Sequence, residues 1–72
     1  MRRQPVTSST MRSVGYAADQ TTLEIEFTSG AVYRYLEVPP AAHAQLLSAE
    51  SLGAYFNTHI RPAFPFRRMR EE

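Results

Sequence analysis

Arginine is the residue type in this sequence with the clearest binding chemistry, because it supplies every side-chain cation. The 72 residues include eight Arg and no Lys, and the formal net charge is +1. A guanidinium offers five donors in a rigid fork, stays charged, and stacks on aromatic rings and bases. Such side chains suit contacts with nucleic acid or with acidic protein surfaces. The eight are Arg2, Arg3, Arg12, Arg34, Arg61, Arg67, Arg68 and Arg70.

The charges are unevenly distributed along the chain. Residues 1–16 carry a net charge of +3, residues 17–60 carry −4, and residues 61–72 carry +2. Basic ends therefore flank an acidic middle, and basic tails commonly contact nucleic acid or acidic partners. We expect a partner to bind at the ends of the chain. An RNA site would have to avoid Glu24 and Glu26, whose carboxylates repel phosphates.

Catalytic and metal-binding arrangements are not indicated by the sequence. Without Cys or Lys, thiol catalysis, disulfides and Schiff-base chemistry are impossible. His43, His59 and Glu50 could share a metal, but a zinc site needs three or four ligands held close, and no His-x-x-x-His pair is present. Ser51, His43 and Asp19 could be imagined as a triad, but they lack a nucleophile-elbow motif. We predict no enzyme activity, no metal and no cofactor.

Aromatic side chains are the second candidate for binding chemistry. Tyr33 and Tyr35 are two positions apart in a strand pattern, so they share a face. On an exposed sheet they could stack on bases, whereas on a covered face they would pack in the core with their hydroxyls at the rim. Tyr55 is a further candidate contact. Asn57, within a helical pattern, could contact a partner, a loop carbonyl or water.

Three strands are expected in the first half of the chain, at residues 10–17, 22–28 and 31–37. The second has the clearest pattern, because apolar and acidic residues alternate with a period of two. A three-residue loop at 28–30 would put the tyrosines on the apolar face, with Gly30 in the left-handed conformation. The pairs in that register are Ile25 with Tyr33, Leu23 with Tyr35, and Glu24 with Arg34. A two-residue loop would put both tyrosines on the acidic face, so we prefer the longer loop.

Two helices are expected in the second half, at residues 40–49 and 52–60. Ser51 is a candidate N-cap for the second helix. Arg61 precedes Pro62, which disfavours helical geometry at Arg61 and should end this helix. One apolar face runs along it at helical spacing. That face comprises Leu52, Tyr55, Phe56, His59 and Ile60.

These elements predict a single α+β domain: a three-stranded antiparallel sheet (a β-meander) followed by two α-helices packed on one face. We expect residues 1–9 to be a mobile N-terminal segment, residues 10–66 to be the domain, and residues 67–72 to be a charged C-terminal tail. No apolar run approaches the roughly 20 residues that span a bilayer, and no signal-peptide pattern is visible, so we expect a cytoplasmic protein.

Motifs spread over about residues 8–66 resemble the KTSC domain, which is named after the C-terminal region of some lysyl-tRNA synthetases. It also occurs alone in small bacterial and phage proteins. The resemblance implies a small domain for which RNA binding is the usual suggestion. This chain departs from the pattern at Leu52, where members often carry Lys. The matching residues are Gly15-Tyr16, Leu23, Phe27, Gly30, Tyr33-x-Tyr35, Val38-Pro39, Leu46, Ala49-x-Ser51-x-Gly53, Phe56-Asn57 and Ile60.

Two functional hypotheses follow. The first is a non-catalytic binding module of the translation or transcription apparatus that contacts RNA through arginines near the chain ends. The second is a protein-binding regulator, plausibly phage-encoded, that docks on a host assembly such as RNA polymerase. Both describe a monomer without a small-molecule substrate or a membrane partner. The expected contact residues are Arg2, Arg3, Arg12, Arg61, Arg67, Arg68 and Arg70, with Tyr33, Tyr35 and Tyr55 as aromatic contacts.

Overall fold

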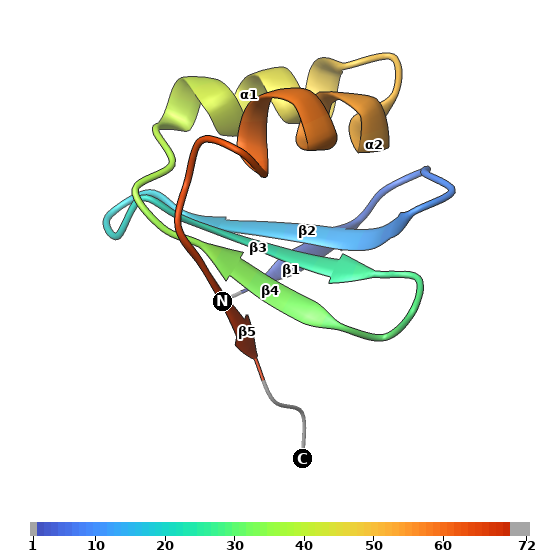
Figure 1. The fold of residues 1–72 in the computed structure, drawn as a ribbon, viewed down its shortest axis with the longest axis horizontal. Helices are drawn as coiled ribbons and strands as arrows, with labels where there is room; N and C mark the ends of the chain where they lie inside the picture. Colours follow the sequence, from blue (N-terminus) through green and yellow to red (C-terminus); the bar gives the residue numbers. More distant parts are fainter. Residues whose placement is uncertain (1, 70–72) are drawn as a thin grey trace.

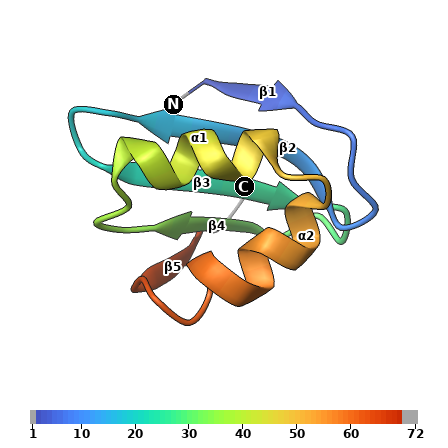
Figure 2. The same ribbon diagram turned by 90° about the horizontal axis from the view of Figure 1, so that it is seen from above.

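The computed structural model describes residues 2–69 and arranges them as a curved antiparallel sheet with helices over one face (Figure 1). The sheet order follows the chain order, β1-β2-β3-β4-β5 (Figure 2). The helices lie between β4 and β5 in the sequence. The strands are β1 (Arg3–Pro5), β2 (Met11–Ala17), β3 (Thr22–Phe27), β4 (Val32–Tyr35) and β5 (Phe66–Met69).

The prediction of three strands was wrong, because residues 2–69 form five; the α+β class itself agrees with the structure. The two additional strands, β1 and β5, are the edges of the sheet. Edge strands are often short and carry Pro or charged residues, which block further pairing. β1 ends at Pro5, and β5 contains Arg67 and Arg68, so both segments look like polar termini in the sequence.

The predicted hairpin register is confirmed. β3 and β4 pair Leu23 with Tyr35, Glu24 with Arg34 and Ile25 with Tyr33. Residues 28–30 form the loop, and Gly30 has a φ of +98°, a conformation that side-chain-bearing residues rarely adopt. The tyrosines therefore share the helix-facing side of the sheet with Leu23 and Ile25.

The helical segments are α1 (Pro40–Ser48), α2 (Leu52–Tyr55) and η1 (Phe56–Ile60). The Ser51 cap is confirmed, because its hydroxyl accepts a hydrogen bond from the Ala54 N–H at 3.2 Å. The second helix begins where expected, but its latter half is π-helical: the Arg61 N–H donates to the Phe56 carbonyl, five residues back, at 2.9 Å. No helix within residues 2–69 is long and apolar enough to cross a membrane.

The core lies between the helices and the sheet. Leu46 of α1 and Ile60 of η1 are fully buried against the apolar face of β2 and β3. Partly buried side chains, among them Tyr16 and Tyr33, surround this core. Its members are Met11, Val14, Leu23, Ile25, Tyr35, Val38, Leu46, Phe56 and Ile60.

Candidate functional site

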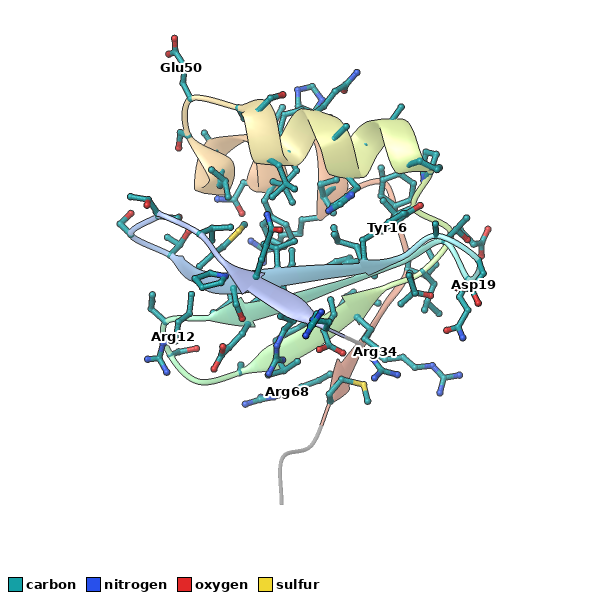
Figure 3. All side chains as sticks on the ribbon, turned by 180° about the vertical axis from the view of Figure 1, so that it is seen from behind. Arg12, Tyr16, Asp19, Arg34, Glu50 and Arg68 are labelled. Atoms are coloured by element: carbon teal, nitrogen blue, oxygen red, sulfur yellow. The ribbon has the colours of Figure 1, made fainter. Side chains whose placement is uncertain are left out.

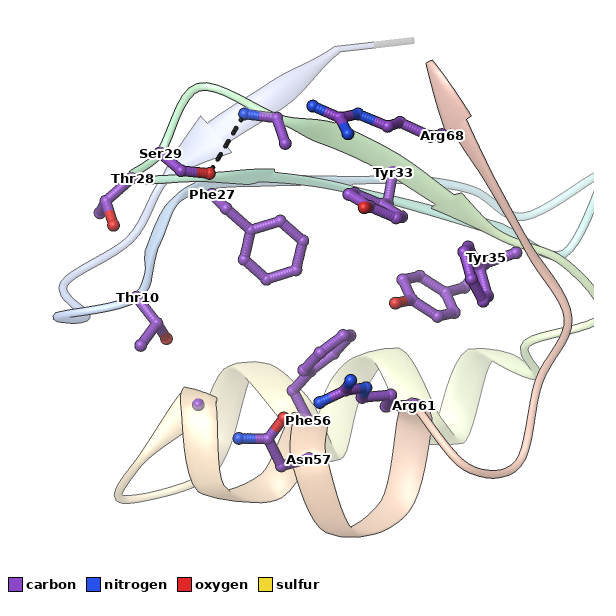
Figure 4. A pocket seen from close by; sticks show the side chains of 13 residues that line it. Thr10, Phe27, Thr28, Ser29, Tyr33, Tyr35, Phe56, Asn57, Arg61 and Arg68 are labelled. Atoms are coloured by element: carbon purple, nitrogen blue, oxygen red, sulfur yellow. Dashed lines mark hydrogen bonds between the residues drawn. The ribbon is translucent and has the colours of Figure 1, made fainter.

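A groove of 560 Å³ opens between the α2–η1 helix and the margin of the sheet formed by β4 and β5 (Figure 4). Among residues 2–69, no acidic side chain lines it. Its aromatic lining consists of Phe27, Tyr33, Tyr35, Phe56 and Phe66. Its polar and cationic lining consists of Thr10, Thr28, Ser29, Asn57, Arg61 and Arg68.

The helical wall of the groove is one stripe of the α2–η1 helix. Gly53, Asn57 and Arg61 line the groove and are four positions apart, which places them on the same helical face. A Cβ at Gly53 would lie 2.7 Å from Thr10 Oγ1, closer than side chains tolerate. Glycine at this position therefore lets the helix approach the loop before β2 and narrows that end of the groove.

The strand wall is built by cross-strand pairs between β4 and β5. Phe66 is opposite Tyr35 and Arg68 is opposite Tyr33. The Phe66 ring centroid lies 5.5 Å from the centroids of both tyrosines, which are themselves stacked at 6.4 Å. The guanidinium carbon of Arg68 is 5.9 Å from the Tyr33 centroid, within the range of a cation–π contact. Since 55% of Phe66 is exposed, a large apolar ring faces solvent beside a cation.

The two tyrosines have different environments. Tyr35 is only 4% exposed and packs edge-on against Phe56, with centroids 5.2 Å apart. Burial raises the pKa of the Tyr35 hydroxyl, and the neighbouring Arg61 cation partly opposes that rise. Tyr33 is half-buried at the rim. Tyr35 is thus a core residue whose edge reaches the groove, whereas the ring of Tyr33 borders the opening.

Three arginines outside the groove are held by carboxylates or carbonyls of β3 and its loop. Figure 3 labels two of them, Arg12 and Arg34. Glu24, whose side chain is 8% exposed, accepts from Arg34 Nε at 2.7 Å and lies 3.1 Å from Arg3 Nη1. Arg12 Nη2 donates to the Thr28 carbonyl at 3.1 Å, and its Nη1 is 3.7 Å from Glu26. The expected pairing of Arg34 with Glu24 is confirmed. Arg3 and Arg12, two expected contact residues, already have partners within the fold.

Three further expected contact residues lie away from the groove, and a fourth falls outside the described part of the chain. Arg67 is exposed on β5 and opposite Arg34, so it points to the other face of the sheet from Arg68. Arg2 is exposed beside β1, and Arg70 lies outside the described residues. The Tyr55 hydroxyl donates to Gln45 Oε1 at 2.7 Å, bridging the second helix to α1 rather than lining the groove.

A second hollow of 350 Å³ lies between β1 and α1. Arg2 and Arg3 line it together with Tyr16 and His43, whose rings stack with centroids 4.5 Å apart. Burial lowers the pKa of His43. The Tyr16 hydroxyl donates to the Val38 carbonyl at 2.6 Å, which fixes the ring in place. This hollow thus combines two arginines with a histidine whose pKa burial lowers.

Sequence reasoning named Arg61, Arg68, Tyr33 and Tyr35, and the structure brings these four to one groove. It did not name Phe66 or Thr10. No local pattern in residues 66–69 marks a strand, and only the pairing with β4 places Phe66 and Arg68 on one face. Within residues 2–69, no group of three His, Cys, Asp or Glu side chains is placed to hold a metal ion.

Comparisons with known proteins identify relatives along most of the chain. The KTSC domain model matches residues 7–64. A protein from Stutzerimonas stutzeri (strain A1501) is 50% identical over 62 residues, covering 86% of this chain and 87% of its own. A lysine–tRNA ligase from Nostoc punctiforme is 39% identical over 61 residues, which cover 85% of this chain but 11% of the ligase. The crystal structure of a KTSC domain protein from Yersinia pestis superposes with a TM-score of 0.93 at 42% identity, covering 96% of this chain and 97% of that one.

Proposed function

Because this chain belongs to the KTSC domain family, we propose that it is a small non-catalytic module that binds RNA through the groove between the α2–η1 helix and strands β4 and β5. The observation that carries this proposal is the combination in one opening of exposed aromatic rings with two arginines. Tyr33 and Phe66 offer stacking surfaces, and Arg61 and Arg68 offer positive charge. Proteins that bind single strands combine these two features.

Within the described part of the chain, residues 2–69, the groove lining contains cations and no acidic residue, which supports an anionic partner. Glu24 and Glu26, the carboxylates that would repel phosphates, are on the other side of the sheet and are neutralised by Arg3, Arg34 and Arg12. As far as residues 2–69 are concerned, a phosphate backbone would therefore meet cations in the groove without a competing carboxylate.

The ligase relatives give independent support. The matching regions belong to proteins named lysine–tRNA ligase, from Nostoc punctiforme and Trichormus variabilis among others. A domain attached to a protein that acts on tRNA gains from a contact with that RNA. We carry over this partner class only, because the matched region is 11% of those ligases.

A protein-binding regulator that docks on a host assembly such as RNA polymerase is the second candidate. Phe66 favours it, since an exposed aromatic ring on an edge strand suits a protein contact as well as a base. Recovery of a partner protein from the native host after nuclease treatment would support it. Loss of every partner on nuclease treatment would support RNA.

The test is a titration of labelled tRNA and of a single-stranded RNA at several salt concentrations. Arg61→Ala and Arg68→Ala should each weaken binding and reduce the slope of log K against log salt by about one, because each removes a phosphate contact. Arg67→Ala is the matched control: it removes the same charge from the same strand but on the other face, and should change binding least. Equal losses for Arg67→Ala and Arg68→Ala, or no binding by the wild type at low salt, would refute the groove as an RNA site.

A further inference from the structure

Asn57 is a polar side chain of the groove for which the fold of residues 2–69 shows no stabilising role. It is exposed on η1 and directed at the groove (Figure 4). Its amide makes no hydrogen bond to any other residue in the range 2–69. Asparagine is a weak helix former, so an interior helical position gains nothing from it. The neighbouring polar residues differ in this respect, since Ser51 caps the helix and Tyr55 bonds to Gln45.

Asn57 shares the helical wall of the groove with Arg61, and the aromatic rings of the strand wall lie across the opening. Along the helix it is four residues from Gly53, at the narrow end, and four residues from Arg61. Across the opening lie Tyr33 and Phe66, the rings with exposed surface. A planar group stacked on these rings would present its edge to the wall opposite them. On that wall, within the described residues, Asn57 is the side chain that offers both a hydrogen-bond donor and an acceptor, through its amide.

The size and shape of the groove limit what can enter. A volume of 560 Å³ is that of a site for one small organic group. Bases in a duplex are stacked and paired, so they cannot insert, whereas unpaired bases can be splayed out, stacked on aromatic rings and hydrogen-bonded along their edges. Arg61 and Arg68, one on each wall, are placed for the phosphates on either side of an inserted base.

We propose that the groove holds one unpaired nucleotide of RNA, with its base stacked on Tyr33 and Phe66 and its base edge hydrogen-bonded by the Asn57 amide. This inference rests on the proposed RNA-binding function and adds to it the form of RNA that is recognised and a residue that contacts the base. Arg61 and Arg68 supply affinity that does not depend on sequence, and Asn57 supplies contact with the base itself.

Asn57 offers a direct spectroscopic reporter, because it is the single Asn of the chain. In a ¹⁵N-labelled sample, its side-chain amide gives one pair of signals, assigned by their disappearance in Asn57→Ala. Addition of a single-stranded RNA octamer should shift this pair strongly. A hairpin stem of the same composition, closed by a short stable loop, should bind more weakly and leave the pair near its free position.

Affinities complete the test. Asn57→Ala should weaken octamer binding about five- to tenfold, as expected for loss of a base contact, with an unchanged salt slope. The variant should fold normally, since Ala is a better helix former. Thr58→Ala, an exposed neighbour outside the groove, is the matched control and should bind like the wild type. If the wild type binds no RNA, the proposed function fails. If it binds RNA but Asn57 signals stay unmoved, or stem and octamer bind equally, RNA binding stands and the unpaired-base inference is overturned.

Discussion

Arginines on the two faces of the sheet have different partners. On the open face, Arg3 and Arg34 clamp the carboxylate of Glu24, which is almost fully buried between them. On the helix-facing side, Arg68 lies over the Tyr33 ring and Arg61 borders the groove, and no carboxylate from residues 2–69 is among the lining residues. The same side chain therefore acts as a structural clamp on one face and as a candidate ligand contact on the other.

This difference changes how the net charge is interpreted. Counting charges along the chain suggests basic ends and an acidic middle, with RNA kept away from β3. In the fold, the carboxylates of β3 are paired with arginines from β1, β2 and β4, so β3 does not present an unpaired acidic surface. Whether a charged side chain can contact a partner depends on the pairing of the strands. That pairing brings Arg3 and Glu24 together from distant positions in the sequence.

Removal of Glu24 is expected to have the largest effect on this comparison. Glu24→Ala removes the largely buried carboxylate that Arg3 and Arg34 share, and leaves both cations without that partner. It should lower the free energy of unfolding by about 2 kcal/mol. Urea denaturation measures this change. Glu50→Ala, in an exposed loop far from the sheet, is the control and should stay within about 0.5 kcal/mol of the wild type. An unchanged unfolding midpoint for Glu24→Ala would show that the clamp does not contribute to stability.

Substitution of one arginine on each face should change stability less than Glu24→Ala does. The arginine that matters more for stability should matter less for RNA affinity. Arg34→Ala removes a 2.7 Å charged hydrogen bond to Glu24 and should cost about 1 kcal/mol of stability, reduced by the partial exposure of Arg34. Arg68→Ala removes one cation–π contact at an exposed edge and should cost about 0.5 kcal/mol or less. For RNA affinity the order should reverse. Thermal or urea unfolding, run beside an RNA titration, gives both quantities for each variant.

A similar loss of stability in both arginine variants would contradict the division between the faces. So would a similar loss of RNA affinity. Arg34→Lys adds a further check, because a lysine ammonium retains the charge but not the guanidinium fork. It should recover part of the stability that Arg34→Ala loses.

Local patterns in the sequence were enough to predict the centre of the fold. The alternation of Leu23, Glu24 and Ile25, together with the loop at Gly30, determined the β3–β4 register and the Glu24–Arg34 pair. Ser51 marked the start of the second helix in the same way. In each case the signal lies within a few residues of the structure that it predicts.

The edges of the sheet and the groove could not be predicted in this way. β5 follows three helical segments and pairs with β4 only because the intervening helices pack across the sheet and return the chain to it. The sequence Phe66-Arg67-Arg68-Met69 has no apolar alternation, so nothing local marks it as a strand. The groove combines Tyr33, Asn57 and Phe66 from three separate elements, and only the tertiary arrangement brings them together.

The smallest expected effect is the dependence of stability on pH. It should arise from His43 in the β1–α1 hollow and not from the groove. Burial holds the pKa of His43 below its usual value, so the unfolded chain takes up a proton before the folded chain does. Stability should therefore be fully present above pH 6.5, the ordinary pKa of histidine, and decline as the pH falls through and below it. Urea unfolding at pH 7.5 and 5.5 should show a larger loss for the wild type than for His43→Gln. The proposed RNA contacts do not include His43, so RNA affinity should not follow the same pH change. An equal pH response in His43→Gln would remove His43 as the cause, and a parallel change in RNA affinity would show that the two regions are coupled.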